Sequence, residues 1–173
     1  YKIFSILCRN AESCTVIIKT DIASKLCKSQ PTKDSPLWYG ILTLLNVIPT
    51  DYNYTHRFII ESLPTVVFML KENSFPARLQ SAVTSFILRI NNLYTTISIE
   101  YPIIFNSLMT LLFKRMNKTF AICIDPNTRR DEIQEYLRVL RNCLLIFNIQ
   151  EEFPFHQLPG ISDSTENRSI AID

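Results

Sequence analysis

The chain has 173 residues, of which 47% are hydrophobic and 20% charged, and its formal net charge is +2. This balance excludes intrinsic disorder over most of the length and allows a domain with a sizeable core. The sequence has two glycines, although tight β-hairpins and phosphate-binding loops need glycine for conformations that other residues avoid. We therefore expect neither a β fold nor a nucleotide-binding α/β fold.

Apolar residues recur at helical spacing in short blocks, and each block ends at proline, asparagine or a capping residue. This pattern predicts a series of short helices. In chain order they cover residues 1–9, 14–28, 37–47, 56–70, 75–93, 98–115 and 128–148. A polar turn with two prolines, at 30–36, separates the second helix from the third, because proline cannot donate a backbone hydrogen bond. Pro64 either interrupts the fourth helix or begins a new one.

Capping residues and charges predict the later helix boundaries. Ser74 is the expected N-cap of the fifth helix, and Ser98 begins the sixth. The basic pair Lys114 and Arg115 suits the end of the sixth helix, because cations are stabilised at a helix C-terminus. Asp125 is the expected N-cap of the seventh helix, whose acidic start fits the opposite end of the helix dipole.

We assign residues 1–158 to one helical domain and residues 159–173 to a polar, aperiodic tail that we expect to be disordered. Within the domain, Leu140 is expected in the core of the last helix. The segment 151–158 contains two phenylalanines and a leucine outside any regular helical pattern. We expect this segment to fold back over the exposed end of the helical array, which needs a cap.

Three of the predicted helices share a core string when they are aligned on Asn46, Asn92 and Asn142. Each asparagine has an aliphatic residue five and two positions before it. The asparagines are 46 and 50 residues apart, close to the roughly 40 to 47 residues of armadillo and HEAT repeats. A repeat of this kind cannot bury its apolar face alone, so we expect successive units to stack on one another.

These strings resemble the third helix of armadillo repeats, in which a leucine, a variable residue, an asparagine and an apolar residue follow one another. The resemblance covers roughly residues 37–148, and the string at 136–145 is also similar to a segment of ataxin-10-type armadillo proteins. It implies an all-α fold in the form of a right-handed α-solenoid. The glycine that separates the first two helices of an armadillo repeat is absent here, so HEAT-like helix pairs remain an alternative.

In armadillo proteins that bind extended peptides, the third-helix asparagine faces a concave groove and exchanges hydrogen bonds with the peptide backbone. The resemblance therefore implies a ladder of asparagines, to which arginines on the same helices add positive charge. The predicted partner-binding residues are Asn46, Arg89, Asn92, Arg138, Arg141 and Asn142. Two alternatives remain: the amides cap neighbouring turns or lie in solvent, and the arginines belong to a solvated face with i,i+4 ion pairs.

The sequence thus predicts a protein-interaction scaffold that holds a peptide or helix of a protein partner in a concave groove. A purely structural segment of a larger solenoid is the alternative from another class. Nucleic-acid binding is disfavoured, because phosphate recognition normally needs a larger positive excess than +2.

Catalysis, metals and cofactors find no support in the sequence. The two histidines, His56 and His156, belong to no recognisable catalytic motif. The five cysteines are scattered without the spacing of a zinc site or a disulfide framework. No apolar stretch reaches the roughly 20 residues that a membrane span requires, and no signal peptide is recognisable. We expect a cytoplasmic or nuclear protein that is not an enzyme.

Overall fold

The computed structural model describes residues 10, 13, 16, 37–48, 50, 53–72 and 74–151. The helices are α4 (Leu37–Val47), α5 (Asn53–Lys71), α6 (Ala77–Arg89), the 3-10 helix η1 (Asn91–Leu93), α7 (Tyr94–Glu100), α8 (Pro102–Ile124) and α9 (Arg130–Glu151). These residues contain no strand, so the predicted all-α class is confirmed for this part of the chain. The predicted helices at 1–9 and, apart from residue 16, at 14–28, the turn at 30–36, residues 152–158 of the capping segment and the tail lie outside the described residues.

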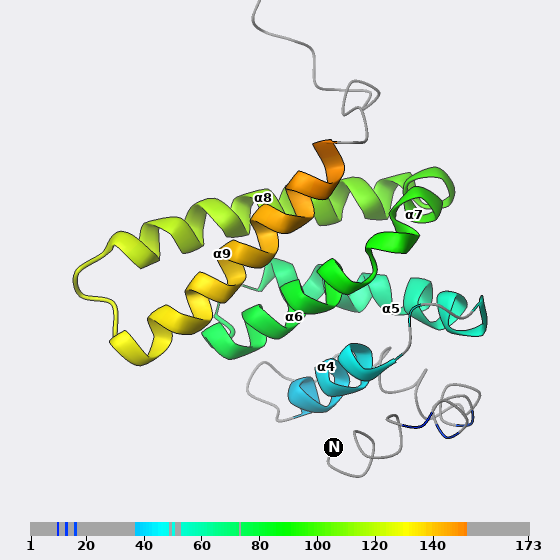
Figure 1. The fold of residues 1–173 in the computed structure, drawn as a ribbon, viewed down its shortest axis with the longest axis horizontal. Helices are drawn as coiled ribbons and strands as arrows, with labels where there is room; N and C mark the ends of the chain where they lie inside the picture. Colours follow the sequence, from blue (N-terminus) through cyan, green and yellow to red (C-terminus); the bar gives the residue numbers. More distant parts are fainter. Residues whose placement is uncertain are drawn as a thin grey trace, which may run out of the picture.

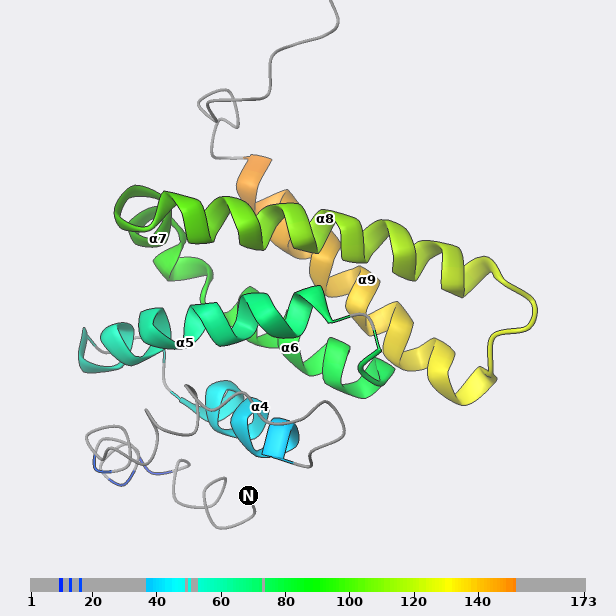
Figure 2. The ribbon, with the colours of Figure 1, turned by 180° about the vertical axis from the view of Figure 1, so that it is seen from behind.

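The helices form two layers. Helices α4, α6 and α9 lie side by side in one layer, with α6 in the middle, and α5 and α8 lie side by side in the other (Figures 1 and 2). The short η1 and α7 connect α6 to α8 at one end of the layers (Figure 1). Helix α8 also packs along α9, so the last two long helices close the stack as an antiparallel pair.

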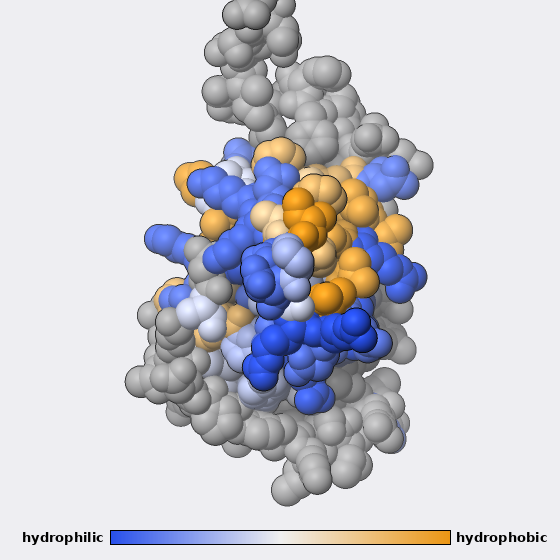
Figure 3. Space-filling view, turned by 90° about the vertical axis from the view of Figure 1, so that its left-hand side faces the viewer, coloured by the Kyte–Doolittle hydropathy of each residue, from blue (hydrophilic) through white to orange (hydrophobic). Residues whose placement is uncertain are grey.

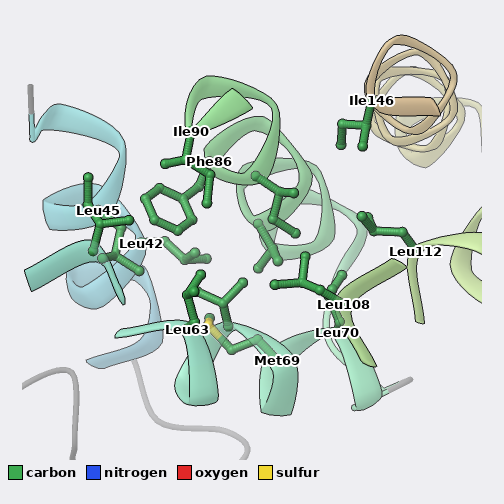
Figure 4. Close-up of a cluster of buried hydrophobic side chains, with 14 of the residues drawn as sticks. Leu42, Leu45, Leu63, Met69, Leu70, Phe86, Ile90, Leu108, Leu112 and Ile146 are labelled. Atoms are coloured by element: carbon green, nitrogen blue, oxygen red, sulfur yellow. The ribbon is translucent and has the colours of Figure 1, made fainter. Parts of the chain in front are cut away.

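A continuous apolar core fills the space between the layers. Leu42 and Leu45 of α4 point toward Phe86 of α6, and the core continues to Leu112 of α8 and Ile146 of α9 (Figure 4). All five side chains are buried. Burial of this kind supplies most of the stability of short amphipathic helices, because an isolated helix of this length is marginal in water.

Trp38 anchors the first helix of this core. Its side chain is 0% exposed, and its ring lies 5.7 Å from that of Phe68 and 5.3 Å from that of Phe75, measured between centroids. Phe68 belongs to α5 and Phe75 to the loop after it. The aromatic contacts therefore fix α4 against both the end of α5 and the start of α6.

The alternatives left open at Pro64 are resolved in favour of a single helix. Helix α5 runs from Asn53 to Lys71 with Pro64 inside it, and the Pro64 side chain is exposed. Proline at this position removes one backbone N–H and strains the preceding turn. The apolar residues on both sides of Pro64 nevertheless pack into one core, so tertiary burial holds the helix together.

Two predicted helix starts, the N-cap at Ser74 and the beginning of a helix at Ser98, are wrong. The Ser74 hydroxyl donates to Oε1 of Glu72 at 2.6 Å, and the N-cap position of α6 is Pro76. Ser98 lies inside α7, where its hydroxyl donates to the carbonyl of Thr95 at 2.8 Å. In both cases the hydroxyl donates a hydrogen bond to a nearby acceptor and does not cap a helix. Short polar side chains commonly form such local hydrogen bonds. Pro102 instead occupies the first turn of α8, a position for which its fixed φ is suited.

Two other predicted boundaries are also wrong, because α8 is longer than expected. Lys114 and Arg115 lie in the middle of α8, which continues to Ile124. Asp125 follows the end of α8, and its Oδ1 accepts the backbone N–H of Asn127 at 2.9 Å. This local hydrogen bond makes a turn between α8 and α9. Asp125 therefore ends one helix and does not begin the next.

The core residues of α9 are Val139, Cys143 and Ile146, which are all 0% exposed. Leu140, which we expected in the core, is only partly buried. It lies one position, about 100°, around the helix from Val139. The leucine-rich centre of α9 thus has the predicted extent, but its buried side is rotated toward α6.

Candidate functional site

The three aligned asparagines lie in different parts of their helices. Asn46 is in the last turn of α4, Asn92 is in η1 after α6, and Asn142 is in the middle of α9. The Nδ2 atom of Asn46 donates to the carbonyl of Leu42 at 2.9 Å and to that of Ala82 at 3.1 Å. The second of these bonds joins α4 to α6.

Asn142 joins α9 to α6 from the other side. Its side chain is buried, and Nδ2 donates to the hydroxyl of Thr84 at 3.1 Å and to that of Ser85 at 3.0 Å. Asn92 is exposed and donates to the carbonyl of Thr50 at 3.0 Å. The amide donors of all three asparagines therefore bind carbonyl or hydroxyl groups of the chain itself. Binding of a partner by these asparagines stays a prediction.

The three predicted arginines also separate. Nη2 of Arg89 donates to the carbonyl of Ile48 at 2.6 Å, close to the end of α4. Nη1 of Arg138 pairs with Oε1 of Glu135 at 2.7 Å on the surface of α9. Arg141 is exposed and forms no ion pair with the residues that the structure describes. Of the three guanidinium groups, that of Arg141 is therefore the one available to a partner.

Most of the large apolar side chains that are exposed on the described helices lie on α8 and α9, and sequence reasoning did not identify this surface. Six apolar side chains on this pair are more than half exposed, and Ile103 lies apart from the others in the first turn of α8. We define the α8–α9 face by the other five: Phe113, Phe120, Ile124, Leu137 and Leu144. The three on α8 are spaced by seven and four residues, and the two on α9 by seven. Residues at these spacings lie along one side of a helix.

The two apolar lines meet across the seam between the helices. The ring of Phe113 in α8 contacts that of Phe147 in α9 edge to face, with centroids 6.2 Å apart and planes at 82°. Phe147 follows Leu144 by three residues and therefore lies beside it on α9. On the opposite side of α9, Val139 and Asn142 face the core and α6. The α8–α9 face is consequently the outer side of the stack.

Figure 3 views the molecule from the end where α8 passes into α9. Apolar side chains gather there in one patch, next to a strongly hydrophilic area. Contiguous apolar patches of this kind are uncommon on isolated domains and often mark a contact surface.

Positive charge accompanies the apolar line on α9. Arg130 precedes Leu137 by seven residues and Arg141 follows it by four, so all three lie on one side of the helix. Arg130 is exposed and, like Arg141, has no ion pair within the part of the chain that the structure describes. Helix α8 contains no acidic residue. The face therefore combines apolar side chains with unneutralised guanidinium groups.

The described residues offer no metal site, since they contain no group of three or more histidine, cysteine, aspartate or glutamate side chains that could hold an ion. Cys143 is buried in the core, and this burial raises the pKa of its thiol to about 12. A thiol with that pKa is neutral near pH 7 and is a poor nucleophile or ligand. None of the helices in the described ranges has both the length and the apolar content to cross a bilayer.

Comparison of the chain with protein-family models, with curated proteins and with solved structures gives no match. The described helices combine a partly charged apolar face with a well-packed core beneath it, and a surface of this kind is suited to association with another surface.

Proposed function

We propose that this chain is a protein-interaction module built as a right-handed α-solenoid, and that it binds its partner through the α8–α9 face. The order of the helices supports the solenoid part of this proposal. The sequence α4, α6, α9 in one layer and α5, α8 in the other is the order that stacked helical hairpins produce. The aligned asparagines at 46 and 142 lie in the same layer, which supports a repeat relation between α4 and α9.

The observation that carries the binding function is the exposure of large apolar side chains on a helix pair with an otherwise ordered core. Phe120 and Ile124 are 58% and 66% exposed, although each would gain roughly 1.5 to 3 kcal/mol if fully buried. A partner that covers this face would recover part of that free energy, and aromatic residues are common anchors of protein interfaces.

This contact surface differs from the asparagine groove that the sequence suggested. Asn46 and Asn142 donate hydrogen bonds that hold α4 and α9 to α6. A partner that recruited those amides would have to break these bonds first. Arg141, by contrast, lies on the α8–α9 face and belongs to both proposals.

A second candidate function has one specific observation in its favour. The α8–α9 face is on the side of α9 opposite α6, where a further helix pair of the same solenoid would stack. In that case the segment is a purely structural part of a larger array, and the face is covered by repeats of the same protein.

Site-specific photocrosslinking tests the proposal. The chain is produced in cells with p-benzoylphenylalanine in place of Phe120 or, separately, Leu137. The control carries it in place of Arg57, whose side chain on α5 is 88% exposed. We expect adducts to one partner protein from positions 120 and 137, none from position 57, and loss of the adducts when Leu144→Ser is added.

Equal adducts from all three positions, or none from any, would contradict binding at this face. Crosslinks confined to further repeats of the same polypeptide would establish the structural alternative.

A further inference from the structure

We propose that the occupant of the α8–α9 face is an amphipathic α-helix of a partner protein, with acidic residues beside its apolar stripe. This inference rests on the proposed function and adds the chemistry of the partner. It follows from two properties of the face, the spacing of its apolar residues and the placement of its charges. Both properties also argue against a second copy of the chain and a lipid surface as the occupant.

The spacing of the apolar side chains matches a helix. Phe113 and Phe120 on α8, like Leu137 and Leu144 on α9, are seven residues apart, which corresponds to about 10 Å along a helix axis. A helix laid along the seam presents its own apolar residues at i, i+3, i+4 and i+7 with the same rise. Ridges of side chains on such a helix can enter the groove between two packed helices.

The charges on the face call for acidic residues in the occupant. Arg130 and Arg141 flank Leu137 on one line of α9, and between residues 130 and 148 no acidic residue shares that line. Two of the three acidic residues in this part of α9 are paired elsewhere: Glu132 with Arg129 at 3.9 Å and Glu135 with Arg138 at 2.7 Å. Burying a guanidinium without a counter-charge is costly, whereas a carboxylate can accept two of its hydrogen bonds.

A second copy of the chain fits this face poorly. In a two-fold symmetric dimer, the same surface of both protomers meets itself. The guanidinium groups of Arg130 and Arg141 would then lie against a surface on which the line from residue 130 to residue 148 supplies cations and no carboxylate. Like charges brought together in this way oppose association.

A lipid surface also fits poorly. Membrane-bound helices keep their cations at the edge of the apolar face, where these reach the headgroups. Arg141 instead lies between Leu137 and Leu144, four residues after the first and three before the second. Inserting both leucines would draw the guanidinium toward the acyl chains, where a charge is expensive. The acidic helix neutralises the same group.

Selection from a displayed peptide library tests the inference. The probe is a phage library of helix-forming peptides of 18 residues, with leucine fixed at i, i+3, i+4 and i+7 and the flanking positions randomised. Selection uses the whole chain in four forms. These are the wild type, the double variant Phe120→Ser/Leu137→Ser, the double variant Arg130→Glu/Arg141→Glu, and the single variant Arg138→Glu. Arg138 is exposed on the same helix but off the face, so its variant is the matched control.

We expect the wild type and Arg138→Glu to enrich peptides with aspartate and glutamate at the flanking positions. The Arg130→Glu, Arg141→Glu variant should bind these peptides about tenfold or more weakly and should itself enrich lysine and arginine. Circular dichroism of every variant must match the wild type, which the surface positions allow. Enrichment of peptides without acidic bias, or an unchanged preference after charge reversal, would overturn the inference while leaving binding at the face intact.

The remaining outcomes separate the two proposals. If no enriched peptide loses affinity in the Phe120→Ser, Leu137→Ser variant, the proposed function itself fails. Retention on phosphatidylserine-containing vesicles that this variant abolishes would assign the face to lipid. Dimerisation that this variant abolishes, measured by sedimentation equilibrium, would assign it to a second copy. Peptide binding that requires Phe153→Ser with Phe155→Ser would assign it to the chain's own C-terminal segment. Each of these results overturns the acidic-helix inference.

Discussion

Arg115 of α8 donates a hydrogen bond from Nη1 to Oε1 of Gln80 in α6 at 3.0 Å, and both side chains are buried. Nη2 of the same guanidinium donates to the carbonyls of Leu70, at 2.5 Å, and Glu72, at 3.1 Å, where α5 ends. One side chain of α8 thus satisfies carbonyl groups at the end of α5 and contacts the first turn of α6. Cations are favoured at such a helix end. Burial nevertheless lowers the pKa of Arg115.

Replacing this guanidinium should destabilise the fold strongly. Arg115→Met keeps most of the side-chain volume but leaves the carbonyls of Leu70 and Glu72 without their donor, so we expect a loss of about 3 kcal/mol in the free energy of unfolding. Urea denaturation followed by circular dichroism measures it. The neighbouring Lys114→Met is the control, because Lys114 is exposed and should change stability by about 0.5 kcal/mol or less.

Asn142 should contribute to stability through Thr84. Asn142→Ala removes the hydrogen bonds to α6 and should cost about 1 to 2 kcal/mol. Thr84→Val removes one acceptor, so the double variant should lose less than the sum of the single losses. A double-mutant cycle by urea denaturation gives the coupling. Strict additivity would mean that the bond of 3.1 Å has no energetic role.

Two aspartate substitutions two residues apart should behave differently and so test the orientation of α9. Val139→Asp places an unpaired charge at a position that is 0% exposed and should unfold α9. Leu137→Asp introduces the same charge at a position that is 51% exposed and should leave the thermal midpoint nearly unchanged. Melting curves by circular dichroism compare the two. Similar midpoints would show that α9 has a different rotation about its axis.

Stability should fall as the pH rises above about 9, and Cys143 should account for part of the fall. In the unfolded chain a cysteine thiol has a pKa of about 8.5, whereas burial raises the pKa of Cys143 to about 12 in the fold. Between these values the unfolded state loses the thiol proton and the folded state keeps it. The stability that the neutral thiol provides is therefore complete below pH 8 and declines by up to about 1.4 kcal/mol per pH unit above 9.

Cys143→Ala removes this titration. Urea midpoints at pH 8, 9 and 10 should decline less steeply for Cys143→Ala than for the wild type, although the variant is less stable at pH 8 because it leaves a small cavity. Groups that titrate in both proteins cancel in the comparison. Parallel declines would show that Cys143 is accessible to solvent.

Local patterns in the sequence were sufficient to predict much of the helical structure. The helix at 37–47 has the predicted bounds, and the apolar face of α6, including Leu79, Val83 and Phe86, is buried as expected. These features follow from periodicity and from the nearest prolines. They need no knowledge of which helices become neighbours.

Features that depend on the neighbours could not be predicted in the same way. Arg115 was assigned to the end of its own helix because cations are stabilised at a helix C-terminus, yet its acceptors lie 35 to 45 residues earlier in the chain. The α8–α9 face was missed for a related reason. Helix α8 carries apolar residues around much of its circumference, so its sequence does not indicate which of them stay exposed. Leu140 was expected in the core of α9, but it is only partly buried, because contacts with α6 set the rotation of α9 about its axis.

The central position of α6 has a consequence for how the structure opens. Asn46 binds this helix from α4 and Asn142 binds it from α9, so its amide hydrogens reach solvent only when an outer helix has detached. Opening should therefore begin at the two outer helices and proceed inward, with α6 exchanging its amide hydrogens most slowly. A ligand seated on α9 would then slow hydrogen exchange in α6, a helix that it does not touch.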